Sequence, residues 1–235
     1  MKKAFTLAEV LITLSIIGLI SVLTIPSLVK NYKNKLYAAS IEKIYSQITD
    51  AVQAVMNDEH SSEFYKTTAG VLPDDNEDGS KKDCASTTMG SCWFMRNYLS
   101  VAKGMVDCTS KKINGDKGTR PVCVADEYTT PSAEGSMIHF GNCVQTVSGA
   151  AVCMTLNPTN GVTSVFVDTN GPAQPNFTGV DVFVMNISPS GVVTDWSTDP
   201  AKCNTNSGTN YGHAADYGTG CLTKVMNAGW KIEDK

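Results

Sequence analysis

The chain has 235 residues, of which 42% are apolar and 18% charged, and its formal net charge is −4. This composition is globular and excludes a wholly disordered or collagen-like chain. Residues 1–29 contain two lysines and one glutamate, so the remainder carries a net charge of −5, from 17 basic and 22 acidic residues. An acidic body argues against binding to nucleic acid through general phosphate neutralisation, and no nucleic-acid partner is expected.

Apolar residues are concentrated near the N-terminus. Between Ala4 and Val29 the only ionisable side chain is Glu9. As a helix, residues 6–29 would be about 36 Å long, enough to cross a hydrocarbon core of roughly 30 Å. A secretory signal peptide has a shorter apolar run and a small-residue cleavage site, and residues 30–35 offer no such site. A plain membrane anchor would have no reason to carry Glu9, because a carboxylate in hydrocarbon costs roughly 2.5–3.5 kcal/mol.

Residues 2–9 read KKAFTLAE and resemble the prepilin motif of type IV pilins and type II secretion pseudopilins. In that family a short basic leader is cut just before a Phe, the new amino terminus is N-methylated, and an acid is the fifth mature residue. The resemblance implies that a prepilin peptidase cleaves between Ala4 and Phe5, that Phe5 is methylated, and that Glu9 acts in assembly. The family usually has Gly where this chain has Ala4.

The resemblance also implies a partner for the acid. In the family, the acid pairs with the free amino terminus of a neighbouring subunit, so Glu9 would neutralise the amine of Phe5 on an adjacent copy. Such a pair is much cheaper in lipid than a lone charge. The expected partners are copies of itself or related pilins, the prepilin peptidase, the pilus or secretion assembly machinery and the lipid bilayer. Pro26 lacks a backbone donor and predicts a kink near the outer membrane face.

The implied location is the cytoplasmic (inner) membrane, crossed once with the head outside the cytoplasm, and then a pilus or pseudopilus.

Residues 31–60 show an amphipathic helical pattern, which fits either an independent surface helix or a continuation of the membrane helix. The resemblance favours one long helix. The chain is therefore divided into a leader (1–4), a transmembrane assembly helix (5–29), an amphipathic helix continuing into the head (30–60) and a disulfide-containing α+β globular head (61–235).

The sequence of the rest of the head predicts a second helix and a sheet. Residues 88–103 have an apolar side and precede Gly104, which predicts a helix that this glycine ends. Short runs rich in Val, Phe and Ile, separated by Gly, Pro and Asn turns, predict antiparallel strands at 137–140, 151–156, 162–168, 181–187 and 192–196. The predicted fold class is α+β, with a long N-terminal helix packed on a C-terminal antiparallel sheet, as in pilins.

Two further segments resemble bacterial pilin-like proteins. Residues 167–183 contain Asp168, Asn170 and Asp181 within an Asp-x-Asn-Gly, Pro-Asn and Gly-x-Asp-x-Phe pattern, and residues 229–232 resemble the ends of such proteins. The role implied for the first segment is structural, as an Asx-rich turn that fixes two strands of the sheet.

All eight cysteines follow residue 80, in the part expected outside the cytoplasm. An even number in an exported head favours disulfides over a metal site, and eight cysteines allow 105 pairings. Two pairs are predicted. Cys143 and Cys153 flank a hairpin turn around residues 148–149, and Cys203 and Cys221 would close a loop rich in Asn, Gly and Thr.

One segment matches the first half of a calcium loop. Asp74, Asn76 and Asp78 alternate, and Gly79 permits the sharp turn. The twelfth position is Ala85 rather than Glu, so a solvated acidic loop is the favoured interpretation and calcium binding the alternative. No other cofactor is expected. No catalytic residue is predicted either, because three histidines and scattered serines and aspartates define no catalytic arrangement.

These observations support a structural subunit of a type IV pilus or type II secretion pseudopilus, processed and assembled through its N-terminal helix. The alternative is a membrane-tethered exported binding module, for adhesion or substrate capture, whether or not it sits at a filament tip. An exported enzyme is the least supported reading. The sequence does not separate a major from a minor subunit, or a pilus from a secretion or DNA-uptake filament.

Overall fold

The computed structural model describes residues 6–71, 87–102, 110–112, 119–121, 123–125, 128–130, 133–136, 142–204 and 218–232. The helices are α1 (Leu7–Asp58), η1 (Phe64–Lys66), η2 (Thr68–Gly70), α2 (Gly90–Tyr98), η3 (Pro200–Asn204) and α3 (Cys221–Asn227). The strands are β1 (Ser110–Lys112), β2 (Thr119–Pro121), β3 (Tyr128–Thr130), β4 (Ala133–Ser136), β5 (Asn142–Gln145), β6 (Ala151–Leu156), β7 (Thr163–Asp168), β8 (Val182–Ile187) and β9 (Val193–Thr194).

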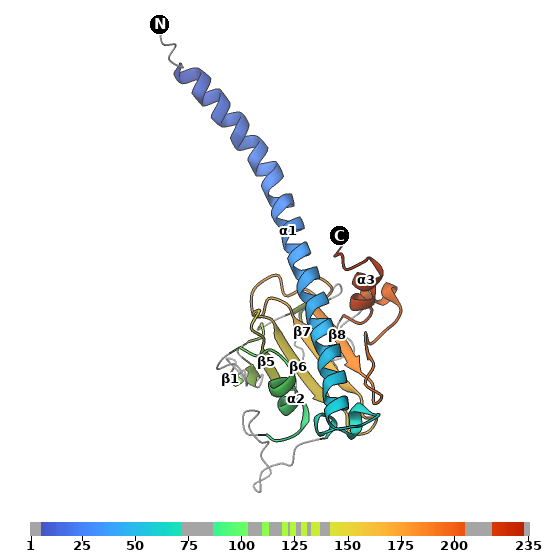
Figure 1. Cartoon of the computed structure of the whole chain (residues 1–235). Helices are drawn as coiled ribbons and strands as arrows, with labels where there is room; N and C mark the ends of the chain where they lie inside the picture. Colours follow the sequence, from blue (N-terminus) through green and yellow to red (C-terminus); the bar gives the residue numbers. More distant parts are fainter. Residues whose placement is uncertain are drawn as a thin grey trace.

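Helix α1 is a single continuous element of 52 residues. Its N-terminal half projects away from the head, and its C-terminal half lies across the sheet (Figure 1). The buried residues of α1 all fall between Asn34 and Val55. The helix continues through Pro26, so the prediction of one long helix is confirmed; the kink at this proline stays a prediction.

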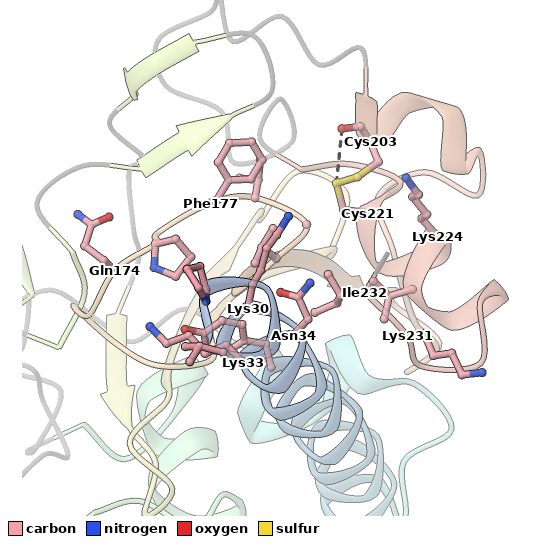
Figure 2. Close-up of a pocket in the computed structure, with 18 residues that line it drawn as sticks. Lys30, Lys33, Asn34, Gln174, Phe177, Cys203, Cys221, Lys224, Lys231 and Ile232 are labelled. Carbon is pink, nitrogen blue, oxygen red and sulfur yellow. Dashed lines mark hydrogen bonds between the residues drawn. A yellow bond between two sulfur atoms is a disulfide. The ribbon is translucent and has the colours of Figure 1, made fainter. Parts of the chain in front are cut away.

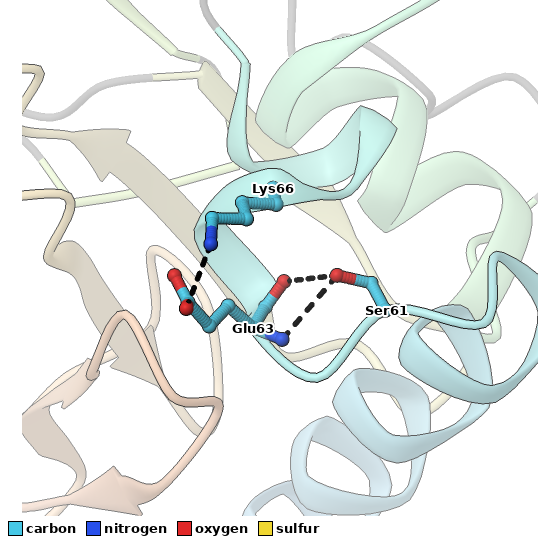
Figure 3. A network of polar contacts seen from close by, with 3 residues as sticks. All are labelled: Ser61, Glu63 and Lys66. Carbon is cyan, nitrogen blue, oxygen red and sulfur yellow. Dashed lines mark hydrogen bonds and ion pairs between the residues drawn. The ribbon is translucent and has the colours of Figure 1, made fainter.

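The chain turns sharply after α1. His60 adopts a left-handed backbone conformation (φ 51°). The next turn is held by Ser61, whose hydroxyl donates to the carbonyl of Glu63 (2.8 Å) and accepts the Glu63 N–H (3.3 Å), as Figure 3 shows. Lys66 adds an exposed ion pair with the Glu63 carboxylate (2.8 Å). An exposed pair of this kind contributes little to stability, so this cluster positions the turn and does not form a site.

The main sheet is an antiparallel meander in the order β5-β6-β7-β8-β9. The strands predicted at 151–156, 162–168 and 181–187 correspond to β6, β7 and β8, so this part of the prediction is confirmed. The strand predicted at 137–140 lies outside the described residues.

The sheet is covered on both faces. Toward α1 it buries residues from every second position of β5 to β8, which pack with the isoleucines and valines of the helix: Val144, Val152, Met154, Val165, Val167, Phe183, Met185 and Ile187. The alternate residues form a second cluster with residues 123–125 and Tyr128. Burial on both faces explains why these strands are almost continuously apolar rather than alternating.

The predicted helix at 88–103 was too long. Helix α2 ends at Tyr98, and Leu99 is already extended (φ −102°, ψ 150°). Beyond it the chain joins the sheet edge, because Val101 pairs with Thr146 and the Ala102 N–H donates to the carbonyl of Gln145 (2.8 Å). These hydrogen bonds, rather than Gly104, end the helix.

The strand predicted at 192–196 was also too long. Strand β9 ends at Thr194, because Asp195 leaves the sheet and turns toward the C-terminal segment. Its carboxylate accepts the N–H groups of Gly220 and Thr223, both at 2.8 Å, at the start of α3. A side chain distant in sequence thus caps this short helix.

Candidate functional site

The N-terminal half of α1 is apolar around its whole circumference, and none of its residues from Leu7 to Val29 is buried by the described part of the chain. Its large apolar side chains are between 42% and 79% exposed: Leu7, Val10, Leu11, Ile12, Leu14, Ile16, Ile17, Leu19, Ile20, Val22, Leu23, Ile25, Leu28 and Val29. An 18-residue window of this helix has a mean hydropathy of 2.3, so α1 is long and apolar enough to cross a membrane once. An apolar surface of this extent requires lipid or protein around it.

Glu9 lies in the first turn of this helix. Its Oε2 accepts hydrogen bonds from the N–H (2.8 Å) and the hydroxyl (2.7 Å) of Thr6, and the Glu9 N–H donates to the Thr6 hydroxyl (3.3 Å). The two residues form a capping box. Ala4 and Phe5 lie outside the described residues. The expected cut precedes the cap residue Thr6, so processing at that bond would leave the start of the helix intact.

The segment between β7 and β8 is the Asx-rich turn expected from the sequence. The Asn170 N–H donates to Asp168 Oδ1 (3.2 Å), and the N–H groups of Asn176 and Phe177 donate to the two carboxylate oxygens of Asp181 (2.8 and 2.7 Å). The amide of Asn170 donates to the carbonyl of Ala173 (2.8 Å). The turn therefore joins the two strands through its own side chains.

The same turn contains carboxyl groups in an unfavourable environment. Burial raises the pKa of Asp168 to about 8, although the Tyr128 hydroxyl donates to it at 2.8 Å. Burial also raises the pKa of Asp181 to about 6, against the lowering effect of its backbone N–H donors. Burial raises the Tyr128 pKa too, and the charge of Asp168 adds to this effect. The role of these buried groups is structural, because their hydrogen bonds hold the turn and the cluster around Tyr128.

Both predicted disulfides are present, Cys143–Cys153 and Cys203–Cys221. The first joins residues directly opposite each other on β5 and β6. The second joins η3 to the start of α3. Gly179 passes against this bond with φ +81°, and a Cβ there would lie 2.9 Å from the Cys221 sulfur. Every cysteine within the described residues is disulfide-bonded.

A pocket of about 490 Å³ lies where α1 meets the C-terminal segment (Figure 2). Three parts of the chain form it: α1 from Pro26 to Tyr37, the segment 174–180, and the C-terminal segment around α3. Its wall is largely apolar, with Val29, Val180 and Val225 among the lining residues. Four lysines also line it: Lys30, Lys33, Lys224 and Lys231.

This pocket was not predicted from the sequence. Its lysines are separated by up to 201 positions, and each looks like an ordinary surface lysine in its own segment. Asp195 and Tyr128 were missed for the same reason, since their partners lie far away in the sequence. The one signal in the sequence near this site is the presence of lysines directly after the apolar run. Such lysines indicate a membrane boundary and do not predict a pocket.

The calcium candidates Asp74, Asn76 and Asp78 lie outside the described residues. Within the part of the chain that the structure describes, no group of three or more His, Cys, Asp or Glu side chains is arranged to hold a metal ion. Calcium binding at residues 74–79 stays a prediction.

Comparison of the chain with protein-family models, with curated protein sequences and with solved structures finds no match.

Proposed function

We propose that this protein is a structural subunit of a filament of the type IV pilus or type II secretion pseudopilus kind. In this proposal it is made with a leader of four residues, held in the membrane by α1, and then assembled with its helix inside the filament and its head outside. The observation that carries the proposal is the N-terminal half of α1, apolar on every side and carrying one carboxylate, Glu9, in its first turn.

The way in which α1 is attached to the head supports the proposal. Only the C-terminal half of α1 is buried against the head, where it contributes Ile41, Ile44, Ile48, Val52 and Val55 to the core. The projecting half therefore continues directly from a helical segment that is packed on the head, and not from a loose linker. A stiff projecting helix suits a subunit whose copies stack through that helix, because apolar contacts between copies can replace those with lipid.

The position of Glu9 also supports it. Both hydrogen bonds that the carboxylate accepts from Thr6 use Oε2. A carboxylate has about four acceptor sites, so the amine of Phe5 on a neighbouring copy can bind it without breaking the capping box. The attraction between the two charges offsets part of the cost of burying them, so the pair is cheaper in an apolar filament core than Glu9 alone.

Processing is the first test. The full chain is produced with and without a prepilin peptidase, and the mass and amino terminus of the product are determined. We expect loss of residues 1–4 and a methylated Phe5 only when the peptidase is present. An Ala4→Gly variant, which has the residue usual in the family, should be cleaved at least as fast, and Ala4→Lys should not be cleaved. A wild-type precursor that stays uncut with an active peptidase would contradict the proposal.

Assembly is the second test, and it uses Glu9→Gln. Glutamine is compatible with the third position of a capping box, so this change removes the charge and retains the start of the helix. We expect normal cleavage and normal head folding, with filament incorporation lowered about tenfold or more, which corresponds to about 1.4 kcal/mol or more. Glu42→Gln, an exposed carboxylate on the same helix, is the matched control and should assemble normally. Equal incorporation of the two variants would show that Glu9 is not an assembly residue.

A further inference from the structure

We propose that the pocket between α1 and the C-terminal segment binds the headgroup of an anionic phospholipid in the leaflet on the head side of the membrane. This inference goes beyond the proposed filament function. It requires that α1 spans a bilayer and does not require that the protein assembles.

The position of the pocket relative to the apolar helix is the first argument. Residues 7–29 form a helical stretch of about 34 Å, close to the thickness of the hydrocarbon core. Pro26 and Val29 belong both to the end of this stretch and to the wall of the pocket. Lys33 lies about one turn further along α1, roughly 6 Å beyond Val29. The pocket therefore begins where acyl chains end and lies at the depth of the headgroups.

The charge of the pocket is the second argument. Four lysines line it, Asp and Glu are absent from its described lining, and the lysines come from two distant parts of the chain. Lys224 is half-buried, and Figure 2 shows its amine directed toward the Cys203–Cys221 disulfide at the pocket wall. Lys33 and Lys231 are exposed. Lysine is a point-charge binder of phosphate groups, and each lysine near a membrane surface strengthens attraction to anionic lipid.

The apolar wall is the third argument, because it selects a lipid over a small soluble anion. Val180, Val225 and Ile232 line the pocket together with the lysines. A volume of about 490 Å³ is in the range of small-molecule sites. A ligand with a phosphate and an attached apolar portion fits both parts of this lining, whereas inorganic phosphate fits only the charged part.

A second copy of the chain is the competing occupant, since the protein outside residues 1–29 has a net charge of −5 and could present an acidic segment. The lipid is favoured because the apolar wall of the pocket is continuous with the membrane-exposed surface of α1 at Pro26 and Val29. A soluble acidic segment would gain nothing from that continuity.

The test uses the full chain in a neutral detergent, titrated with phosphatidylglycerol or with phosphatidylcholine of the same acyl chains, and bound lipid is counted by native mass spectrometry. We expect one phosphatidylglycerol per protein, bound about tenfold more tightly than phosphatidylcholine, with the preference falling at high salt. The variant Lys33→Gln/Lys224→Gln/Lys231→Gln should lose the preference. The corresponding triple arginine variant should keep it.

The control is Lys35→Gln/Lys43→Gln/Lys202→Gln, which changes the net charge equally with lysines that are exposed and are not among the lining residues of the pocket. It should retain the preference. If the pocket variant lacks the circular dichroism of the wild type, the single variants at Lys33 and Lys231, both exposed, replace it and should each weaken the preference. Equal binding of the two lipids by the wild type, or equal loss in the control, would overturn the proposal. Displacement of the lipid by millimolar inorganic phosphate would also overturn the proposal. A dimer formed by the wild type and by the control, but not by the pocket variant, would do the same.

Discussion

Three aspartates buried in the head illustrate how single residues hold this fold. Asp168, Asp181 and Asp195 are each no more than 6% exposed, and each accepts backbone N–H groups from a turn or helix start. Burial raises the pKa of all three. Their hydrogen bonds are thus gained at the expense of desolvation, and the balance depends on their protonation.

A pH dependence of stability follows at the residue scale. The ordinary pKa of an aspartate is 3.8, and that of Asp168 is raised to about 8 and that of Asp181 to about 6. Between these limits the folded state binds more protons than the unfolded state, so the free energy of unfolding should fall as the pH rises from about 4 to about 8. Urea unfolding across this range measures the slope.

Asp168→Asn should flatten this slope between pH 6 and pH 8, because the substituted side chain has no proton to lose. Asp50→Asn, at an exposed position on α1, is the control and should leave the slope as it is in the wild type. Identical slopes in the two variants would show that the titration of Asp168 does not control stability in this range.

At the scale of elements, the C-terminal segment is held to the head by long-range contacts. Helix α3 has seven residues and begins at Cys221, directly after Gly220, which has a left-handed conformation. Asp195, from the end of β9, caps it. The Cys203–Cys221 disulfide joins it to η3, and Gly179 packs against the sulfurs. So short a helix would not be stable in isolation, and its position depends on these attachments.

Removing this disulfide should therefore destabilise the segment. Closing a loop of 18 residues is worth about 3 kcal/mol in the chain-entropy account. The double variant Cys203→Ala/Cys221→Ala should lose stability by about this amount and become sensitive to proteolysis around α3. Chemical unfolding and mass mapping of the first cuts measure the two effects.

The matched control is Cys143→Ala/Cys153→Ala. Its disulfide lies between β5 and β6, and three further residue pairs of the same register already hold these strands side by side. This variant should lose stability without new cleavage near α3. Cleavage around α3 in both variants, or in neither, would argue against a local role for the Cys203–Cys221 bond.

For the whole molecule, the division of α1 into a projecting half and a packed half is the main structural fact (Figure 1). The projecting half contributes no buried residue, whereas the packed half completes the core against the sheet. The head is therefore a folding unit that includes the second half of α1 and not the first.

Deletion of residues 1–29 should leave a head that folds and is soluble without detergent. We expect an unfolding temperature within a few degrees of that of the full chain, because no core contact is lost. Circular dichroism and gel filtration provide the measurement. Deletion through residue 48 is the control: it removes Ile41, Ile44 and Ile48, whose burial is worth roughly 6 kcal/mol, and should prevent folding. An aggregated or unfolded product of the shorter deletion would contradict the division proposed for α1.

The sequence alone was sufficient for features carried by local or periodic patterns. The apolar run, the amphipathic repeat from Ile41 to Val55, three central strands and the Asx-rich turn all depend on neighbours close in the chain, and each was found where it was predicted. The two disulfides were predicted because one pair flanks a hairpin and the other closes a loop with little apolar content.

Tertiary structure decided what depends on contacts between distant segments. Helix α2 ends early because residues 100–102 pair with the sheet edge, and β9 ends early because Asp195 caps a helix 25 residues away. The lysine pocket exists because the C-terminal segment folds back against α1 at the end of its apolar half. No local pattern encodes such contacts, since their free energy is gained only when the two segments meet.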